Sequence, residues 1–462
     1  MSPTASTRTA ISFQSLENQL AGRVSTAHNA DWDTARQAFN LAVYQQPAAV
    51  VLPADARDVI AVVRFAREHG LRIAPQATGH NAGPLSLEDT ILLKTSHMRG
   101  GEIDPVRRRA RVNAGAQWHD IVPAAAEHGL AALHGSAPDV GIVGYTLGGG
   151  IGWYSRKHGF ASNKVTAIGL VTADGRQMRV DADLQPDLFW ALRGGGGANF
   201  GVVTSLEFEL LPVEQPHAGM FVFDWERTSE VLHVWHELTS HWPDEITTSF
   251  RVLQLPDIPD IPEVVRGRNL AIVNGAVLGD EATADELLAP LRGLGPELDT
   301  WGRVPVDSMV HLHMDPPEPV PAIGGASRLL SRLEPAKIDE IVGLVGPGSG
   351  SPLMGFELRH TGGELGRARR GSGAIARFEG ELLSFAFSMV MGPEMVGPAE
   401  AHLALLDDAV SDHGVGRYSN FSEEKVAMSE LYDEATLQRL QRIRAEHDPD
   451  GLFRANHEIA AA

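Results

Sequence analysis

The segment 76–83 (QATGHNAG) constrains the fold of this chain more than any other stretch. It is a loop of mostly small residues that presents one histidine, His80, shortly after the apolar run 71–74. Small residues let backbone amides approach an anionic or planar ligand closely, and His80 is the strongest nucleophile of the loop. We interpret the segment as a ligand-binding loop with a reactive histidine; a histidine in an ordinary turn is the alternative.

The residues before and after this loop have the pattern of strands and a helix. Residues 49–52 and 71–74 are apolar and extended, and residues 91–94 are predicted as a further strand. Between the first two runs, the spacing predicts a helix that begins after Asp55, a good N-cap residue, and stops at Gly70. The loop therefore follows a strand–helix–strand unit.

Three later stretches also predict regular structure. Asp174-Gly175 separates the apolar runs 165–172 and 177–180, which indicates a hairpin. Residues 187–192 are predicted as a short helix. Apolar and polar side chains alternate over 205–210, a pattern typical of a half-buried strand.

The composition excludes several classes of function. With 39 basic and 59 acidic residues, the chain has a formal charge of −20, which argues against binding to nucleic acid or anionic lipid. There is no cysteine, so disulfides, thiolate nucleophiles and cysteine-based metal sites are excluded. Residues 1–14 lack the apolar core of a secretory signal, and no apolar run reaches 18 residues. We therefore expect a cytoplasmic protein without a membrane span.

Two glycine clusters, 148–150 and 194–197, invite comparison with nucleotide-phosphate loops. Neither has the spacing Gly-x-Gly-x-x-Gly, because Trp153 and Phe200 stand where the third glycine is required. Neither is followed by Gly-Lys-Ser/Thr, so a P-loop is excluded. The clusters are either tight structural turns or loops whose backbone amides hold phosphates.

Several motifs, in this order and spacing, resemble one protein family. They are Gly79-His80-Asn81, then DVGxxGYxxGGG at 139–150, PDLFWALRGGGGANFGVVT at 186–204, Tyr418-Ser419-Asn420, and DPDGLFRAN at 448–456. Together they resemble the berberine bridge enzyme-like oxidases of the vanillyl-alcohol oxidase/p-cresol methylhydroxylase (PCMH) superfamily. The resemblance covers roughly residues 45–212 and 416–460.

The resemblance implies an α+β fold in three parts. Residues 1–212 would form a PCMH-type FAD-binding domain with its core at about 45–212, and residues 213–415 a substrate-binding domain with an antiparallel β-sheet covered by helices. Residues 416–462 would be a C-terminal berberine bridge enzyme-like segment that returns to the FAD domain. The middle domain matches the family only loosely, through LRHTGG at 358–363.

The resemblance also implies FAD, attached covalently from a ring nitrogen of His80 to the flavin 8α-methyl group. Many relatives add a cysteinyl bond, but that position is Ala137 here, so attachment through His80 only is expected. Val140 corresponds to a gate beside flavin C4a, where valine usually admits oxygen. Gln76 departs from an arginine often found before the Gly-His pair. The residues expected to bind FAD are Gln76, Ala77, Thr78, Gly79, His80, Asn81, Ala82, Ala137, Pro138, Val140, Gly141, Gly144, Tyr145, Gly148, Gly149, Gly152, Asn163, Gly201, Val202, Val203, Asn420 and Asn456.

Tyr418 is the first candidate for the catalytic base. It precedes Asn420 and is expected to face the substrate, where a base must take an O–H proton while hydride leaves the adjacent carbon for flavin N5. Because a tyrosine has an ordinary pKa near ~10, it needs a nearby cation or the electron-poor flavin ring to act as a base. Weaker candidates are His360, Tyr145 and Tyr154.

The expected function is that of an FAD-linked oxidase that takes hydride from a C–H next to oxygen or nitrogen in a small alcohol, amine or sugar-like substrate. The electrons would pass to O₂ and release H₂O₂. The alternatives are a dehydrogenase with a non-oxygen acceptor, a non-catalytic flavin-binding protein, and a nicotinamide-dependent reductase. His311 and His313 are interpreted as solvent-facing strand residues, and no metal is expected. The sequence does not identify the substrate, and it does not decide whether the protein forms a homodimer.

Overall fold

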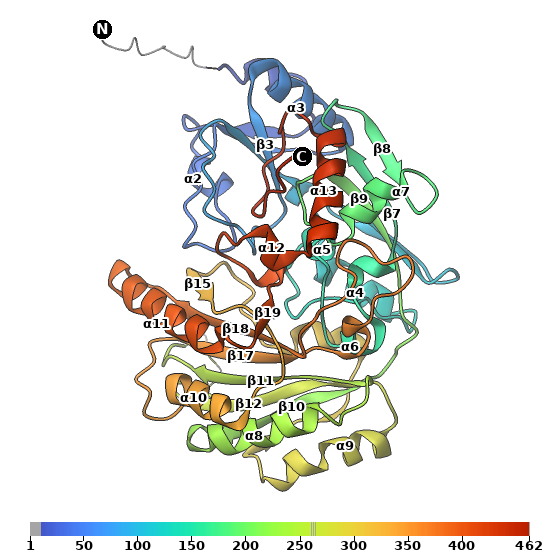
Figure 1. Cartoon of the computed structure of the whole chain (residues 1–462). Helices are drawn as coiled ribbons and strands as arrows, with labels where there is room; N and C mark the ends of the chain where they lie inside the picture. Colours follow the sequence, from blue (N-terminus) through green and yellow to red (C-terminus); the bar gives the residue numbers. More distant parts are fainter. Residues whose placement is uncertain (1–10, 260, 262, 264, 462) are drawn as a thin grey trace.

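The computed structural model describes residues 11–259, 261, 263 and 265–461 (Figure 1). The strands in this part of the chain form three sheets of four, five and ten strands. The two smaller sheets belong to the N-terminal half, and the large sheet is built from residues between His217 and Gly416. The fold is a mixture of helices and sheets, as expected.

The four-stranded sheet has the order β1-β2-β4-β3, and β2, β4 and β3 run parallel. Between β2 and β3 lies α3 (Ala56–His69), whose N-cap Asp55 accepts hydrogen bonds from two backbone N–H groups. Gly70 ends α3 with a left-handed φ of 63°, which favours glycine. These findings confirm the predicted strand–helix–strand unit. The strands are β1 (Arg23–Ser25), β2 (Ala49–Leu52), β3 (Arg72–Gln76) and β4 (Thr90–Lys94).

The five-stranded sheet is antiparallel with the order β5-β6-β9-β7-β8. The predicted hairpin at Asp174-Gly175 is confirmed, since it joins β7 and β8. The predicted alternation is confirmed as well, because Leu206 and Phe208 of β9 are buried. The strands are β5 (Gly101–Asp104), β6 (Arg109–Asn113), β7 (Val165–Val171), β8 (Gln177–Val180) and β9 (Val202–Glu209).

The remaining helices of the N-terminal half are short. The α-helices are α1 (Gln14–Glu17), α2 (Trp32–Ala35), α4 (Trp118–Ala126), α5 (Ile142–Leu147), α6 (Ser155–His158) and α7 (Pro186–Leu192), and the 3₁₀ turns are η1 (Thr95–His97) and η2 (Ala161–Lys164). The helix α7 confirms the short helix predicted at 187–192. Its first residue is Pro186, which has no N–H to leave unsatisfied at a helix start.

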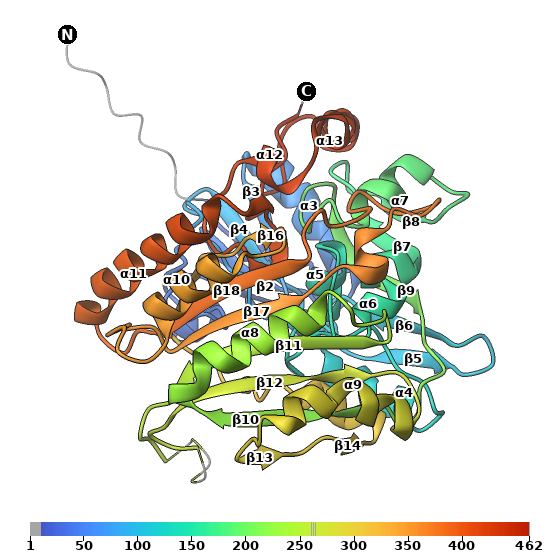
Figure 2. The same ribbon diagram turned by 60° about the horizontal axis from the view of Figure 1, so that its bottom comes forward.

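The ten-stranded sheet is antiparallel and has helices on one face (Figure 2). Its central order is β13-β10-β12-β11-β17-β18-β16-β19, with β14 beside β10 and β15 beside β18. An apolar core fills the space between this face and the helices. The strands are β10 (His217–Asp224), β11 (Ile246–Gln254), β12 (Asn269–Val277), β13 (Leu298–Asp299), β14 (Gly302–Arg303), β15 (Ala322–Gly325), β16 (Leu329–Leu330), β17 (Gly355–His360), β18 (Leu382–Met389) and β19 (Gly414–Gly416).

Four longer helices cover this sheet, and its other face is turned toward the N-terminal half (Figures 1 and 2). This arrangement matches the expected antiparallel sheet covered by helices. The helices are α8 (Thr228–Thr239), α9 (Glu281–Gly293), α10 (Pro335–Val345) and α11 (Pro393–Ser411). Three 3₁₀ turns, η3 (Trp225–Arg227), η4 (Val306–His311) and η5 (Gly363–Gly366), lie in the connections.

The last part of the chain runs back to the N-terminal half. It contains η6 (Ser419–Phe421), α12 (Met428–Leu431) and α13 (Glu434–His447), and α13 packs beside α7 (Figure 1). Ile73 of β3 then pairs with Phe453 in a parallel β-bridge. The division of the chain at residues 212 and 415 stays a prediction.

A buried ion pair fastens this C-terminal segment. Arg444 Nη2 lies 2.9 Å from Asp448 Oδ2, and both side chains are at most 2% exposed. Arg444 also donates to the backbone oxygens of Phe453 and Asn199. Asp448 accepts from the N–H groups of Leu452 and Phe453. Both charges are therefore compensated, and α13, the tail and the second glycine cluster are joined.

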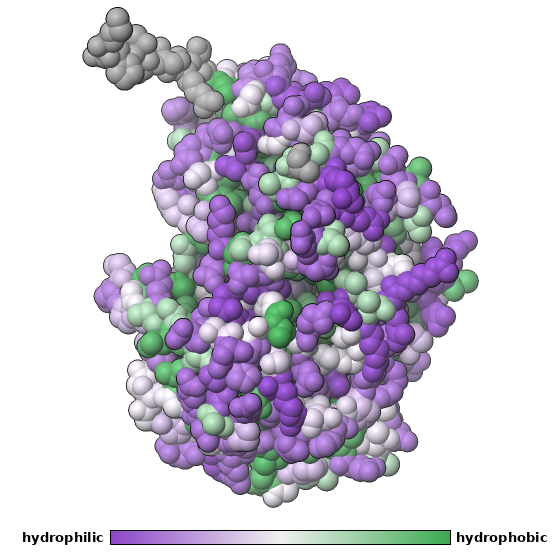
Figure 3. All heavy atoms as spheres, in the orientation of Figure 1, coloured by the Kyte–Doolittle hydropathy of each residue, from purple (hydrophilic) through white to green (hydrophobic). Residues whose placement is uncertain are grey.

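The surface is mainly polar. Hydrophilic residues cover most of the face in Figure 3, in line with the large excess of acidic side chains. Among the helices of residues 11–461 that can be placed, none is both long enough and apolar enough to cross a membrane.

We predict that Arg444→Met destabilises the protein strongly. The substitution leaves the buried carboxylate of Asp448 without its cation, and breaking a buried pair in this way costs about 3–5 kcal/mol. The urea midpoint of unfolding, followed by circular dichroism, measures the loss. Arg439→Met is the matched control, because Arg439 on the same helix pairs with Asp187 at the surface and such pairs contribute about 0–1 kcal/mol. Equal losses in the two variants would show that the buried pair does not fasten the tail.

Candidate active site

A cavity of about 510 Å³ is lined by residues from all three sheets. Most of the residues predicted from the sequence meet here, although they come from five separate stretches of the chain. Those that line the cavity are Gln76, Ala77, Thr78, Gly79, His80, Asn81, Ala82, Ala137, Val140, Gly141, Gly144, Tyr145, Gly148, Gly201, Val203, Tyr418, Asn420 and Asn456.

Five predicted residues do not line this cavity. Pro138 and Asn163 accept hydrogen bonds from backbone N–H groups, and Val202 is buried in β9. A Cβ atom at Gly152 would lie 1.9 Å from a carbonyl oxygen, and one at Gly149 would lie 3.3 Å from a tyrosine ring. These residues shape the loops behind the cavity wall, so a direct role in FAD binding stays a prediction for them.

The cavity wall next to the predicted loops consists largely of backbone. At Gly148 a Cβ atom would lie 1.8 Å from Asn420 Oδ1, so only glycine allows that close approach. At Gly144 no protein atom lies within 4 Å of an added Cβ, and since Gly144 lines the cavity, a side chain there would enter it. The glycines thus leave room for a ligand that lies against the backbone.

Unpaired polar atoms on the wall fit a large polar ligand. Buried side-chain atoms of the cavity lining that have no hydrogen-bond partner in the described chain include Gln76 Nε2, Asn81 Oδ1, Ser419 Oγ, Arg454 Nε and His457 Nδ1. Asp139 Oδ1, on the carboxylate that contacts His80, has none either. Buried polar atoms are normally paired, so these atoms indicate hydrogen bonds to a bound group. The residues present therefore fit an extended cofactor such as FAD.

His80 is held in a defined orientation. Its Nε2 lies 2.6 Å from Asp139 Oδ2, and its ring stacks on Phe39 with centroids 3.6 Å apart. Because the carboxylate accepts the Nε2 proton, Nδ1 is the nitrogen with a free lone pair, and it makes no hydrogen bond within the described chain. The imidazole is therefore oriented as a nucleophile through Nδ1.

Tyr418 and Asn420 form a hydrogen-bonded pair against the first glycine cluster. Tyr418 Oη accepts from Gly150 N at 2.8 Å and from Asn420 Nδ2 at 2.9 Å. The same amide nitrogen donates to Tyr145 O. Burial raises the pKa of Tyr418, while these two donors and the nearby Arg359 cation oppose that rise. The pKa of Tyr418 nevertheless stays above its ordinary value, because the effect of burial is the largest of these.

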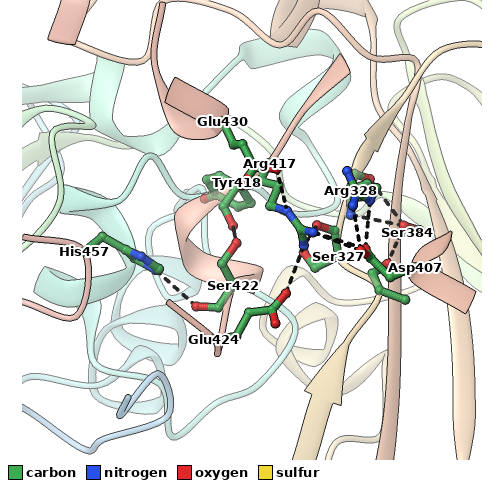
Figure 4. Close-up of polar contacts among 11 residues, drawn as sticks. Ser327, Arg328, Ser384, Asp407, Arg417, Tyr418, Ser422, Glu424, Glu430 and His457 are labelled. Carbon is green, nitrogen blue, oxygen red and sulfur yellow. Dashed lines mark hydrogen bonds and ion pairs between the residues drawn. The ribbon is translucent and has the colours of Figure 1, made fainter. Parts of the chain in front are cut away.

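Arg417 fixes the segment that carries this pair (Figure 4). Its guanidinium is 7% exposed and contacts Asp407, Glu424 and Glu430 within 3.3 Å, and it donates to Ser327 O. On the other side of the segment, the ring of a C-terminal histidine bonds to Ser422 O, as Figure 4 also shows. Tyr418 is therefore placed by contacts to both halves of the molecule.

The cavity wall formed by the ten-stranded sheet carries buried charges. Arg359 Nε lies 3.0 Å from Glu357 Oε2, and His313 Nε2 lies 3.5 Å from Glu357 Oε1. Burial opposes the ionisation of Glu357, but Arg359 and His313 hold the pKa of its carboxyl well below the usual range. Burial also lowers the pKa of His313. Arg251 of β11 completes this charged end of the cavity.

The other part of the same wall is aromatic and apolar. Phe385, Phe387 and Met389 of β18 line the cavity, and the ring of Phe421 packs against Phe385. Glu423 lies beside them and accepts a hydrogen bond from the N–H of a β15 glycine at 2.9 Å. Burial raises the pKa of Glu423 to about 7, against the effect of that hydrogen bond. The chamber over this sheet therefore has a charged end and an apolar end.

Sequence reasoning missed the residues of this wall and the partner of His80. Asp139 belongs to the motif at 139–150, so the sequence indicates that it lies near the site. Its contact with His80, which is 59 positions away, cannot be read from the sequence. The interpretation of His313 as a solvent-facing strand residue was wrong. It follows η4 and is 4% exposed, because Asn274 and Glu357 surround it. No cluster of metal-ligating side chains occurs in the described part of the chain.

The weaker base candidates lie in different places. Tyr145 lines the cavity, but its hydroxyl donates to Leu133 O. His360 and Tyr154 are buried outside the cavity wall. Of the four candidates, Tyr418 alone combines a place on the wall with two donors aimed at its hydroxyl oxygen.

Comparisons with known proteins agree with this geometry. Residues 47–181 match the family of FAD binding domains. The chain is 29% identical to (R)-6-hydroxynicotine oxidase of Paenarthrobacter nicotinovorans over 95% of this chain and 97% of that protein. Matches to three other curated relatives span only 53%, 44% and 26% of those proteins.

Solved structures show the same fold over nearly the whole chain. The structure of 6-hydroxy-D-nicotine oxidase from Arthrobacter nicotinovorans superposes with a TM-score of 0.83 and 26% identity, covering 96% of this chain and 98% of that one. The BBE-like 1 protein of Physcomitrella patens gives a TM-score of 0.85 at 18% identity, covering 98% and 100% of the two chains. Residues 47–181 thus match an FAD binding domain, and the chain shares its fold with 6-hydroxy-D-nicotine oxidase and with a BBE-like protein.

Proposed function

We propose that this protein is an FAD-dependent oxidase that removes hydride from a C–H next to oxygen or nitrogen in a small organic substrate. Bound FAD supplies the hydride acceptor and returns two electrons to O₂, which yields H₂O₂. The observation that carries the proposal is that His80 and Tyr418 line one cavity, the first with its Nε2 held by Asp139 and the second with two donors at its hydroxyl oxygen. A cytoplasmic location and a homodimer stay predictions.

We propose further that FAD is attached through His80 alone. Asp139 holds Nε2 of His80 and leaves Nδ1 free to form a bond. Ala137, which also lines the cavity, has no nucleophilic group, and the chain has no cysteine. One attachment point is therefore what the chemistry of the wall supports.

Tyr418 is our proposed catalytic base. Its hydroxyl oxygen accepts two hydrogen bonds, and these donors stabilise the negative charge that arises when it gives up its own proton. The Arg359 cation favours the same ionised form. A phenolate held in this way can take the proton of a substrate O–H or N–H as hydride leaves the adjacent carbon.

Val140 supports oxygen rather than another acceptor as the oxidant. It is half-buried and lines the cavity between Ala137 and the helix α5, so a side chain of only three carbons lies at the expected gate position. A dehydrogenase with a quinone or protein acceptor is the alternative.

We predict that the enzyme, reduced by substrate without air, is reoxidised within seconds of aeration. The visible absorbance of the oxidised flavin, followed by stopped flow, should return fully. A peroxidase assay should detect one H₂O₂ for each flavin that is reoxidised. Reoxidation that takes minutes, with rapid reduction of a quinone dye, would establish the dehydrogenase instead.

We predict that His80→Ala abolishes covalent attachment. Wild-type protein should keep its yellow colour through acid precipitation and fluoresce on a denaturing gel, whereas the variant should lose its FAD to the supernatant. His119→Ala is the control, because that histidine lies at the surface beside Arg99 and should leave the fluorescence unchanged. Fluorescence that persists in His80→Ala would place the bond elsewhere.

We predict that Tyr418→Phe lowers kcat by roughly 10²–10⁴-fold, the usual contribution of a positioned acid–base group. The flavin content should stay close to wild type, because the ring and its packing remain. The melting temperature should fall modestly, because the buried N–H of Gly150 loses its acceptor. Tyr154→Phe is the matched control, since it removes a buried hydroxyl outside the cavity wall. An unchanged kcat in Tyr418→Phe would remove this residue from the mechanism.

A further inference from the structure

Arg251 is a buried arginine, and among the residues that the structure describes no carboxylate pairs with it directly. Its side chain is on the cavity side of β11, because the neighbouring residues Phe250 and Val252 belong to the core under the helices and side chains alternate along a strand. Arg251 is 5% exposed and lines the cavity. A cation in such a place is costly unless it is paired or hydrogen-bonded.

The hydrogen bonds of Arg251 leave most of its guanidinium unused. Nη1 donates to His313 O at 2.8 Å, and Nε is buried without a partner. Within the described chain no carboxylate oxygen lies within 4.0 Å of its nitrogens. By contrast, Arg156, which is equally buried, donates to four backbone oxygens from Nε and both terminal nitrogens.

The acidic side chains near Arg251 form their hydrogen bonds and ion pairs with other groups. Glu357 lies directly across from Arg251 on β17, but its carboxylate contacts Arg359 and His313. Asp315 accepts a hydrogen bond from Ser136 Oγ at 2.9 Å. Burial lowers the pKa of Arg251, and both carboxylates oppose that effect. They stabilise its charge from a distance but do not occupy its N–H groups.

We propose that Arg251 binds a carboxylate of the substrate, so that the substrates of this oxidase are organic acids with an apolar body. A guanidinium presents paired N–H groups that match the two oxygens of a planar carboxylate. The apolar wall of Phe385, Phe387 and Met389 lines the same cavity and suits the rest of such a molecule. This inference rests on the proposed function and names the substrate class of its site.

The surrounding charges favour a carboxylate over a phosphate. Arg251 and Arg359 are balanced by Glu357 and Asp315, so the charged end has no excess of positive charge. One negative charge can be accepted by the unused N–H groups of Arg251. A dianion would meet repulsion from both acidic side chains.

The test compares two ligands of nearly equal shape on the FAD-loaded protein. Benzoate and benzamide differ in charge, and isothermal titration calorimetry measures both affinities. Wild-type protein should bind benzoate roughly tenfold or more tightly than benzamide, the advantage expected of a hydrogen-bonded charge. Arg251→Met should remove this preference, and Arg251→Lys should retain part of it. Arg64→Met on the exposed face of α3 removes the same charge far from the cavity and should change nothing.

Thermal stability separates a binding role from a structural one. Removing an unpaired buried cation should leave the melting temperature of Arg251→Met unchanged or higher. A lower melting temperature combined with a retained preference for benzoate would assign Arg251 a purely structural role and overturn the inference. Equal affinities for benzoate and benzamide in the wild type, or tighter binding of phenyl phosphate than of benzoate, would overturn it as well.

These outcomes are distinct from a failure of the proposed function. A protein that takes up no FAD, or that forms no H₂O₂ with any substrate, would contradict the oxidase itself. A yellow protein that oxidises neutral substrates and binds benzoate and benzamide with equal affinity would contradict only the role of Arg251.

Discussion

The contact between β3 and the C-terminal tail underlies the rest of this structure. Ile73 N donates to Leu452 O at 2.9 Å, and Arg454 N donates to Ile73 O at 2.8 Å. β3 leads into the His80 loop and the tail leads to Asn456, so these two backbone bonds bring together segments that are nearly 400 residues apart. Asn456 then bonds to the backbone on both sides of Ala82. The buried Arg444–Asp448 pair keeps the tail in place, because separating two compensated charges in the interior is costly.

The two sides of the cavity are built on different principles. The side built from the predicted FAD-binding loops consists of backbone and small residues, which suit a ligand that approaches closely and bonds to N–H and C=O groups. The side built from the ten-stranded sheet consists of charged and aromatic side chains of β11, β17 and β18, whose alternation places every second residue on the cavity face. Tyr418 lies where the two sides meet, and Arg417 holds it there through contacts to α11 and α12.

Local features of the fold were predictable because their causes lie within a few residues. Asp55 caps α3, Gly70 ends it, and the alternation in β9 reports its half-buried position. His313 was predicted wrongly, since its burial depends on Asn274 of β12 and Glu357 of β17, which are distant in sequence. Most residues predicted to bind the cofactor line the cavity, because the sequence motifs that predict them are the same short loops that form its wall.

The sequence by itself determined the α+β fold and the loops that line the cavity, because small-residue motifs and hydrophobic periodicity are properties of short stretches. Only the tertiary structure decided which nitrogen of His80 is free, that Arg359 lies near Tyr418, and that Arg251 meets no carboxylate directly among the described residues. Each of these facts depends on distances between side chains from separate elements, and such distances exist only after the sheets have packed against each other.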